Sequence, residues 1–135
     1  LYSQLKQVKK ITIQRTRIFN LYHKLLENLE FQNFIQRPYF FDYTKHNSHI
    51  YYIIVKKNSR NKLINYLNKK KIKSIFHYVP LHSSLFGKKI TKIKSLMKNT
   101  NFISKNLLRL PMHVYLKPKD VIKICKEINF FFKKF

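Results

Sequence analysis

The sequence predicts a small α+β domain, and three features indicate it. Two short runs rich in β-branched and aromatic residues, at 49–57 and 72–79, are typical of strands. Segments with apolar residues three and four positions apart precede, separate and follow these runs, which is typical of amphipathic helices. The 135 residues show no internal break in composition, so we expect one hydrophobic core rather than two.

The first predicted element is one amphipathic helix over residues 1–29. Its apolar and aromatic residues recur along one face, at Leu1, Leu5, Val8, Ile11, Ile18, Tyr22, Leu25 and Leu29. Such a helix would be about 44 Å long, which exceeds the width of the domain that the remaining residues can form. We therefore expect residues 1–30 to connect a domain at 31–135 with a second body outside this chain. A first residue of leucine instead of methionine agrees with a piece of a longer protein.

The middle of the chain predicts a strand, a helix and a second strand. The run at 49–57 predicts a buried strand. Asn58 and Ser59 are turn and N-cap residues, and a short amphipathic helix follows them. The run at 72–79 predicts another strand, which Pro80 ends because proline cannot donate a hydrogen bond to a sheet.

The last part of the chain predicts two further helices. The segment 85–99 has no clean period, and we expect a loop or an irregular helix there. Thr100 or Asn101 can cap a short helix, and the LRLP sequence at 108–111 is expected to form the turn that ends it. Pro118 has the position of a first-turn proline before a final amphipathic helix.

The charge of the chain is strongly positive, at 29 Lys+Arg against 5 Asp+Glu. Such a balance suggests a polyanion partner, and a basic nucleic-acid-binding module is one alternative for the function. However, 24 of the 29 are lysine, and the chain has one glycine and no alanine. A genome rich in A and T explains the same bias, and readers of nucleic acid favour the arginine fork. We therefore expect only non-specific binding of nucleic acid.

Several kinds of chemistry are excluded by what the chain lacks. Phosphate-cradling loops and nucleophile elbows need several glycines, and Gly87 is the only one. The single Cys125 excludes an internal disulfide and a cysteine-rich zinc site, and it fits a reducing, cytoplasmic compartment. The five carboxylates are scattered, which disfavours paired acid/base chemistry. No apolar run approaches the roughly 18 residues that cross a bilayer, so we expect no membrane partner.

One stretch stands out from this biased composition. SIFHYVPLHSSLFG, at 74–87, places two histidines, a tyrosine, a proline and the glycine close together. His77 and His82 flank the predicted strand end, where rigid scaffolds often present functional groups. We expect no metal there, because no cysteine or carboxylate stands nearby in sequence to complete a ligand set. Two ordinary surface histidines in a loop are the alternative.

Four motifs in order resemble the C-terminal part of the DegT-like family of sugar-nucleotide aminotransferases. They are NSHIYYI at 47–53, LINYL at 63–67, FHYVPLH at 76–82 and TNFISKNLLRLP at 100–111. They are most similar to the pattern of the subgroup that handles dTDP-4-amino-4,6-dideoxygalactose: N-A-H-x-F-Y-I, F-H-Y-x-P-L-H and T-x-x-x-S-x-x-L-L-R-L-P. The resemblance covers nearly the whole chain.

This resemblance implies the fold of aspartate aminotransferase (fold type I), with a large pyridoxal-phosphate domain, a long connecting helix and a small C-terminal α+β domain. It implies transfer of an amino group from a donor amino acid, glutamate being expected, to a dTDP-4-keto-6-deoxyhexose for cell-surface polysaccharide, by an enzyme that is a homodimer when complete. The substrate-binding residues that it implies are His77, Tyr78, His82, Asn47 and His49.

The large pyridoxal-phosphate domain is expected to be absent from this chain. The family's Schiff-base lysine lies in a glycine-rich segment of that domain, and the chain has no such segment. We therefore expect no catalytic residue here and no activity from the 135 residues alone. The alternatives are a domain of an intact enzyme and a nonfunctional gene remnant.

Overall fold

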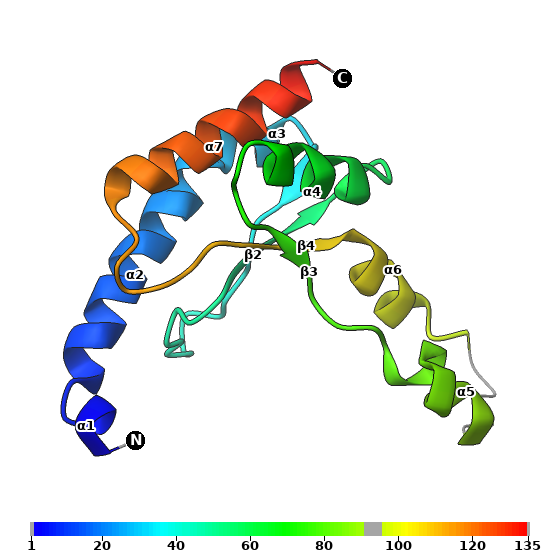
Figure 1. Cartoon of the computed structure of the whole chain (residues 1–135), viewed down its shortest axis with the longest axis horizontal. Coiled ribbons are helices and arrows are strands. Elements are labelled where there is room, and N and C mark those ends of the chain that lie inside the picture. The colour runs from blue at the N-terminus through cyan, green and yellow to red at the C-terminus, as the bar shows by residue number, and fades with distance from the viewer. Residues whose placement is uncertain (1, 91–95, 135) are drawn as a thin grey trace.

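The computed structural model describes residues 2–90 and 96–134, which form an antiparallel sheet covered by helices on one face (Figure 1). The sheet has the order β1-β2-β4-β3. Its strands are β1 (Ile35–Gln36), β2 (Tyr51–Val55), β3 (Ile75–Phe76) and β4 (Leu107–Leu110). All three neighbouring pairs are antiparallel. The α+β class is therefore confirmed.

The two central strands, β2 and β4, separate the core from the opposite face by simple alternation. Side chains point to opposite faces at successive strand positions. Tyr51, Ile53 and Val55 of β2 are fully buried, as is Leu108 of β4. Tyr52 and Arg109 occupy intervening positions and pair directly across the two strands, and Ile54, at the next intervening position of β2, is 7% exposed. The helices therefore cover one face, and Tyr52 and Arg109 belong to the other.

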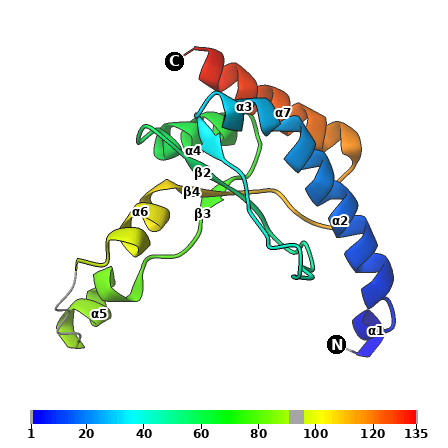
Figure 2. The same ribbon diagram turned by 180° about the vertical axis from the view of Figure 1, so that it is seen from behind.

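The helices that cover the core come from both ends of the chain and from its middle. They are α2 (Val8–Leu25), α3 (Glu27–Phe31), α4 (Arg60–Lys69) and α7 (Pro118–Lys133), whereas α1 (Tyr2–Leu5) precedes α2 and its Tyr2 and Leu5 are exposed. The α2 and α7 helices lie side by side over the sheet (Figures 1 and 2). Each helix contributes fully buried residues to the core, such as Tyr22 of α2 and Ile128 of α7, both 0% exposed. This face contains one continuous apolar core.

Two segments extend from this body and leave a hollow between them. The N-terminal half of α2 forms one side, and an arm of η1 (Leu81–Ser83), α5 (Leu85–Ile90) and α6 (Lys98–Asn106) forms the other (Figures 1 and 2). The loop that precedes β2 lies between them. Gly87 is required in the arm, because a Cβ there would lie 1.7 Å from the carbonyl oxygen of Leu81.

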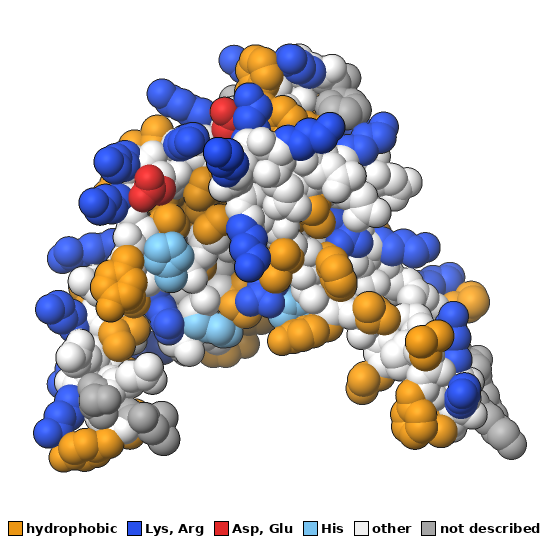
Figure 3. Space-filling view, in the orientation of Figure 1, with side chains coloured by type: hydrophobic (Ala, Val, Ile, Leu, Met, Phe, Trp, Pro, Cys, Tyr) orange, Lys and Arg blue, Asp and Glu red, His pale blue; other side chains and the backbone are white. Residues whose placement is uncertain are grey.

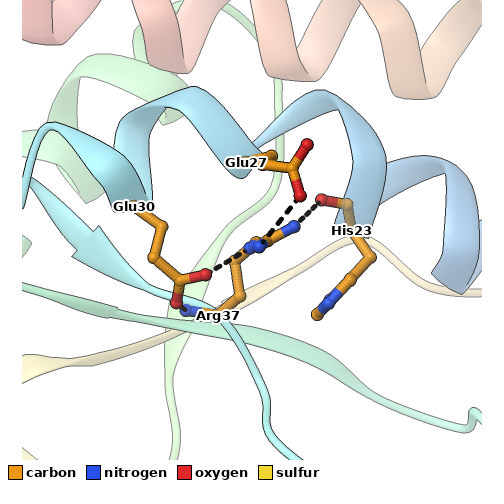
Figure 4. A network of polar contacts seen from close by, with 4 residues as sticks. All are labelled: His23, Glu27, Glu30 and Arg37. Carbon is orange, nitrogen blue, oxygen red and sulfur yellow. Dashed lines mark hydrogen bonds and ion pairs between the residues drawn. The ribbon is translucent and has the colours of Figure 1, made fainter.

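A polar network closes the junction between α2, α3 and β1 (Figure 4). The Arg37 side chain, 11% exposed, donates through Nε to Glu30 and through Nη1 to the carbonyl of His23, both at 2.6 Å. Its Nη2 lies 3.4 Å from Glu27. Two of the chain's five carboxylates are therefore engaged by one guanidinium.

The structure corrects several expectations from the sequence. The single helix predicted over 1–29 is divided into α1, α2 and α3 within residues 2–31, with residue 1 outside the described part, and α2 spans 18 residues, about 27 Å at 1.5 Å per residue. The predicted strand at 72–79 pairs only at Ile75 and Phe76. The loop or irregular helix expected at 85–99 contains α5 and the start of α6, and residues 91–95 of it lie outside the described part.

The expected LRLP turn at 108–111 is wrong, because residues 107–110 are strand β4 in the middle of the sheet. Alternate leucines point into the core there, a two-residue period that is too short to stand out in the sequence. The expected cap at Thr100 or Asn101 is also wrong. The helix begins at Lys98 after Met97, whose φ is 40°.

Two helix starts expected from the sequence are confirmed. Ser59 is the N-cap residue of α4, and Pro118 lies in the first turn of α7. Cys125 lies buried on the inner face of α7. No helix of the described residues is long and apolar enough to cross a membrane.

Candidate functional site

A cavity of about 550 Å³ opens on the sheet face that the helices leave uncovered. The loop before β2, strand β2, the segment after β3 and strand β4 contribute its lining: Phe40, Lys45, His46, Asn47, Ser48, His49, Ile50, Tyr52, His77, Leu107 and Arg109. Histidine side chains are visible along the hollowed side of the molecule (Figure 3). Three stretches that are distant in sequence, 40–52, His77 and 107–109, therefore meet at one place.

The strand register explains how Arg109 enters this cavity. Arg109 lies directly opposite Tyr52 on one side and Ile75 on the other. Directly paired side chains of antiparallel strands have Cβ atoms about 5 Å apart. His77 follows two positions after Ile75, so it extends from the same face of the sheet.

The lining is cationic. Arg109 and Lys45 carry fixed positive charge, three histidines accompany them, and none of the described lining residues is Asp or Glu. Burial, and then the positive charge of Arg109, lower the pKa of His77. The His77 imidazole is therefore neutral near pH 7 and can accept a hydrogen bond or donate one. This arrangement fits an anionic group held by the guanidinium, with polar hydroxyl-bearing parts beside it.

Asn47 and His49 form a local turn at the mouth of the cavity. The Asn47 Oδ1 atom accepts from the His49 backbone N–H at 3.2 Å and lies 2.5 Å from His49 Nδ1. An amide oxygen can only accept, so Nδ1 carries the proton in this contact. The other ring nitrogen, Nε2, is therefore available as an acceptor when the ring is neutral.

The residues predicted from the sequence fall into two groups. Asn47, His49 and His77 meet in the cavity. Tyr78 lines a neighbouring apolar groove of about 630 Å³, which shares His77 and Leu107 with the cavity. His82 lines neither space, and its Nε2 atom lies 2.9 Å from Asn101 Oδ1, which joins η1 to α6.

Sequence reasoning missed Arg109, Tyr52, Lys45 and His46. Arg109 lies inside the LLRLP motif, and strand alternation would have separated it from the buried leucines beside it. The motif was instead interpreted as a turn. Among the described residues, no group of three or more His, Cys, Asp or Glu could hold a metal ion.

Comparison with models of known protein families identifies one family. The model of the DegT/DnrJ/EryC1/StrS aminotransferase family matches residues 1–129. An uncharacterized protein of Methanocaldococcus jannaschii is 27% identical over 131 residues, covering 93% of this chain and 33% of that protein.

Solved structures give the same result for the fold. A DegT DnrJ EryC1 StrS aminotransferase from Brucella abortus superposes with a TM-score of 0.79 at 26% identity, covering 97% of this chain and 34% of that one. Helicobacter pylori PseC, an aminotransferase of pseudoaminic acid biosynthesis, has a TM-score of 0.86 at 19% identity, covering 99% and 36%. The chain thus spans about a third of the length of the relatives it matches.

Proposed function

Because the chain belongs to the DegT/DnrJ/EryC1/StrS aminotransferase family, we propose that it is the small domain of a pyridoxal-phosphate-dependent sugar aminotransferase. Its substrate is a dTDP-4-keto-6-deoxyhexose, and the product is an amino sugar of the dTDP-4-amino-4,6-dideoxygalactose type for cell-surface polysaccharide. In this proposal residues 1–30 connect to the large domain and residues 31–135 form the small domain.

The cationic cavity is the observation that supports this proposal. A nucleotide sugar carries a diphosphate, and a guanidinium forms paired hydrogen bonds to phosphate oxygens. Arg109 holds the diphosphate, and Lys45 adds a second positive charge. His77, His49 and Asn47 contact sugar hydroxyls next to it. Tyr78 extends the substrate surface past His77, where the apolar groove begins. His82, whose Nε2 atom lies 2.9 Å from Asn101 Oδ1, is assigned to holding the arm together instead of to contacting the substrate.

The cavity does not fit pyridoxal phosphate itself. Holding that cofactor requires a lysine for the Schiff base and an acidic residue beside the pyridinium nitrogen. None of the described lining residues is acidic, and the side chain of its one lysine, Lys45, stands in an exposed position. The proposal therefore assigns the cofactor to residues outside these 135, together with the donor glutamate and the second subunit of a cytoplasmic homodimer. The role of this chain is to bind and orient the sugar nucleotide.

Binding of dTDP to the 135-residue chain, measured by calorimetry, tests the proposal. Arg109→Gln should weaken binding by about tenfold or more, because a charge-assisted pair is worth about 1.5–3 kcal/mol. Arg17→Gln is the matched control, since Arg17 is an exposed arginine of α2 away from the cavity. Equal losses in both variants would indicate non-specific attraction to a basic protein. An unchanged affinity in Arg109→Gln would contradict the proposed site.

A second arm of the experiment concerns the cofactor. Incubation with pyridoxal phosphate followed by borohydride should label no single lysine stoichiometrically. One stoichiometric adduct accompanied by transamination would show that this chain holds the cofactor, against the proposal.

A further inference from the structure

The loop that carries Asn47 and His49 is attached to helix α2 by a chain of hydroxyl groups. Thr16 Oγ1 of α2 lies 3.1 Å from Ser48 Oγ, and Ser48 Oγ lies 3.1 Å from His46 Nδ1. The contact between Thr16 and Ser48 joins residues 32 positions apart in sequence. This relay of Thr16, Ser48 and His46 connects the cavity lining to helix α2, which contributes no residue to the lining.

Ser48 is buried and has a left-handed backbone conformation, and both features require stabilising contacts. Its side chain and backbone are 2% exposed, and its φ is 52°, in the left-handed region that residues other than glycine rarely adopt. A buried hydroxyl without partners is costly. The two contacts of Ser48 Oγ therefore stabilise both its burial and the turn that orients Asn47 and His49.

Aromatic packing fixes the other end of the relay. The His46 ring stacks on Phe40, with centroids 4.1 Å apart and planes 6° apart. It also contacts Phe19 of α2 at 4.6 Å. Phe19 and Thr16 are three positions apart, so they share one face of the helix. One face of α2 thus contacts the loop through the Phe19 ring and the Thr16 hydroxyl.

We propose that Thr16 and Ser48 are positioning residues for the cavity, which set the geometry of Asn47 and His49 without touching the ligand. This inference rests on the proposed function for the identity of the ligand, but the attachment of the loop can be tested without any ligand. The motif of the family has alanine where this chain has Ser48, so the relay is a feature of this sequence rather than of the motif.

The relay can operate with either protonation state of His46. When His46 Nδ1 carries no proton, the Ser48 hydroxyl donates to it and accepts from the Thr16 hydroxyl. When Nδ1 carries a proton, it donates to Ser48 Oγ, and the Ser48 hydroxyl then donates to Thr16 Oγ1. Removing either hydroxyl breaks the same connection. Thr16→Val and Ser48→Ala should consequently have effects that do not add.

The test uses the 135-residue chain with dTDP-glucose as the probe, because this compound carries the sugar hydroxyls assigned to Asn47 and His49 as well as the diphosphate. Thr16→Val, which replaces a hydroxyl by a methyl group, should weaken binding about three- to tenfold, as expected for one lost hydrogen bond. Thr16→Ser, which keeps the hydroxyl, should stay within about twofold of the parent chain. The double variant Thr16→Val with Ser48→Ala should lose no more binding affinity than the single variant that loses more. Thr12→Val, on the same helix one turn earlier and similarly half-buried, is the control.

Amide hydrogen exchange of the same variants provides the ligand-independent readout. In Thr16→Val the amides of residues 46–49 should exchange faster, while those of α2 keep the rates of the parent chain. If loop exchange and the affinity for dTDP-glucose are both unchanged in Thr16→Val, the positioning role is refuted. If neither the parent chain nor any variant binds dTDP-glucose but loop exchange still responds to Thr16→Val, the positioning role stands and the proposed sugar-nucleotide site falls.

Discussion

Replacing Arg37 by methionine should destabilise the chain, because this side chain joins helices α2 and α3 to the segment that follows strand β1. Methionine keeps most of the aliphatic length and removes the three guanidinium contacts, to Glu30, His23 and Glu27 (Figure 4). The backbone N–H of residue 37 still donates to Glu30 at 2.6 Å in the variant. The loss is therefore limited to the side-chain contacts.

The structure sets the expected magnitude. The contact with Glu27 counts for little, because that carboxylate is 52% exposed and its distance is 3.4 Å. The contact with Glu30, whose side chain is 32% exposed, is a short charge-assisted bond worth about 1–2 kcal/mol after screening. The His23 carbonyl loses a charged donor in the last turn of α2, which costs about 1 kcal/mol. We expect a decrease of about 2–3 kcal/mol in the free energy of unfolding.

Urea denaturation of the parent chain, Arg37→Met and Arg17→Met measures this loss. Arg17 is an exposed arginine of α2, and its replacement should change the free energy of unfolding by no more than about 0.5 kcal/mol. A loss in Arg37→Met equal to that of Arg17→Met would refute the reasoning.

The pH dependence gives an independent check of the same prediction. Burial alone would raise the pKa of Glu30, but hydrogen bonds from the backbone and side chain of Arg37 outweigh it and lower this pKa. A carboxyl with a lowered pKa adds stability above its unfolded pKa and loses it as the pH falls through the folded value. The difference between the parent chain and Arg37→Met should therefore narrow at pH values below about 4. A difference that stays constant down to pH 2 would contradict the role of Glu30.

Three further predictions concern the core and the arm. Burial raises the pKa of Cys125 to about 12, so a thiol reagent at pH 8 should label the native chain negligibly and the unfolded chain with one equivalent. Leu108→Ala should cost about 2–5 kcal/mol in denaturant unfolding, because Leu108 is fully buried in the central strand β4. Gly87→Ala should speed amide exchange at 81–90 while the core keeps its unfolding midpoint, because the new Cβ meets Leu81 within the arm.

The local elements were largely predictable from the sequence, because they depend on local chemistry. Pro118 lies in the first turn of α7, as its fixed φ predicts. Ser59 is the N-cap residue of α4 as expected, although its hydroxyl donates to the Lys56 carbonyl instead of capping the helix. The β-branched run at 49–57 contains the buried strand β2. The errors came where the sequence signal was short. Strand β4 has only four residues, too few for an alternating pattern to be identified. These residues form a strand because they pair with β2 and β3 in the middle of the sheet.

By itself the sequence determined the α+β class, the order of most elements and the motifs that indicated the aminotransferase family. These follow from composition, periodicity and residue identity along the chain. Only the tertiary structure decided which residues form the cavity. Arg109 reaches it through its pairing with Tyr52, and Ser48 beside Asn47 and His49 contacts Thr16, which is 32 residues away in sequence. Strand register and long-range hydrogen bonds are properties of the folded chain, because each depends on partners that are distant in sequence.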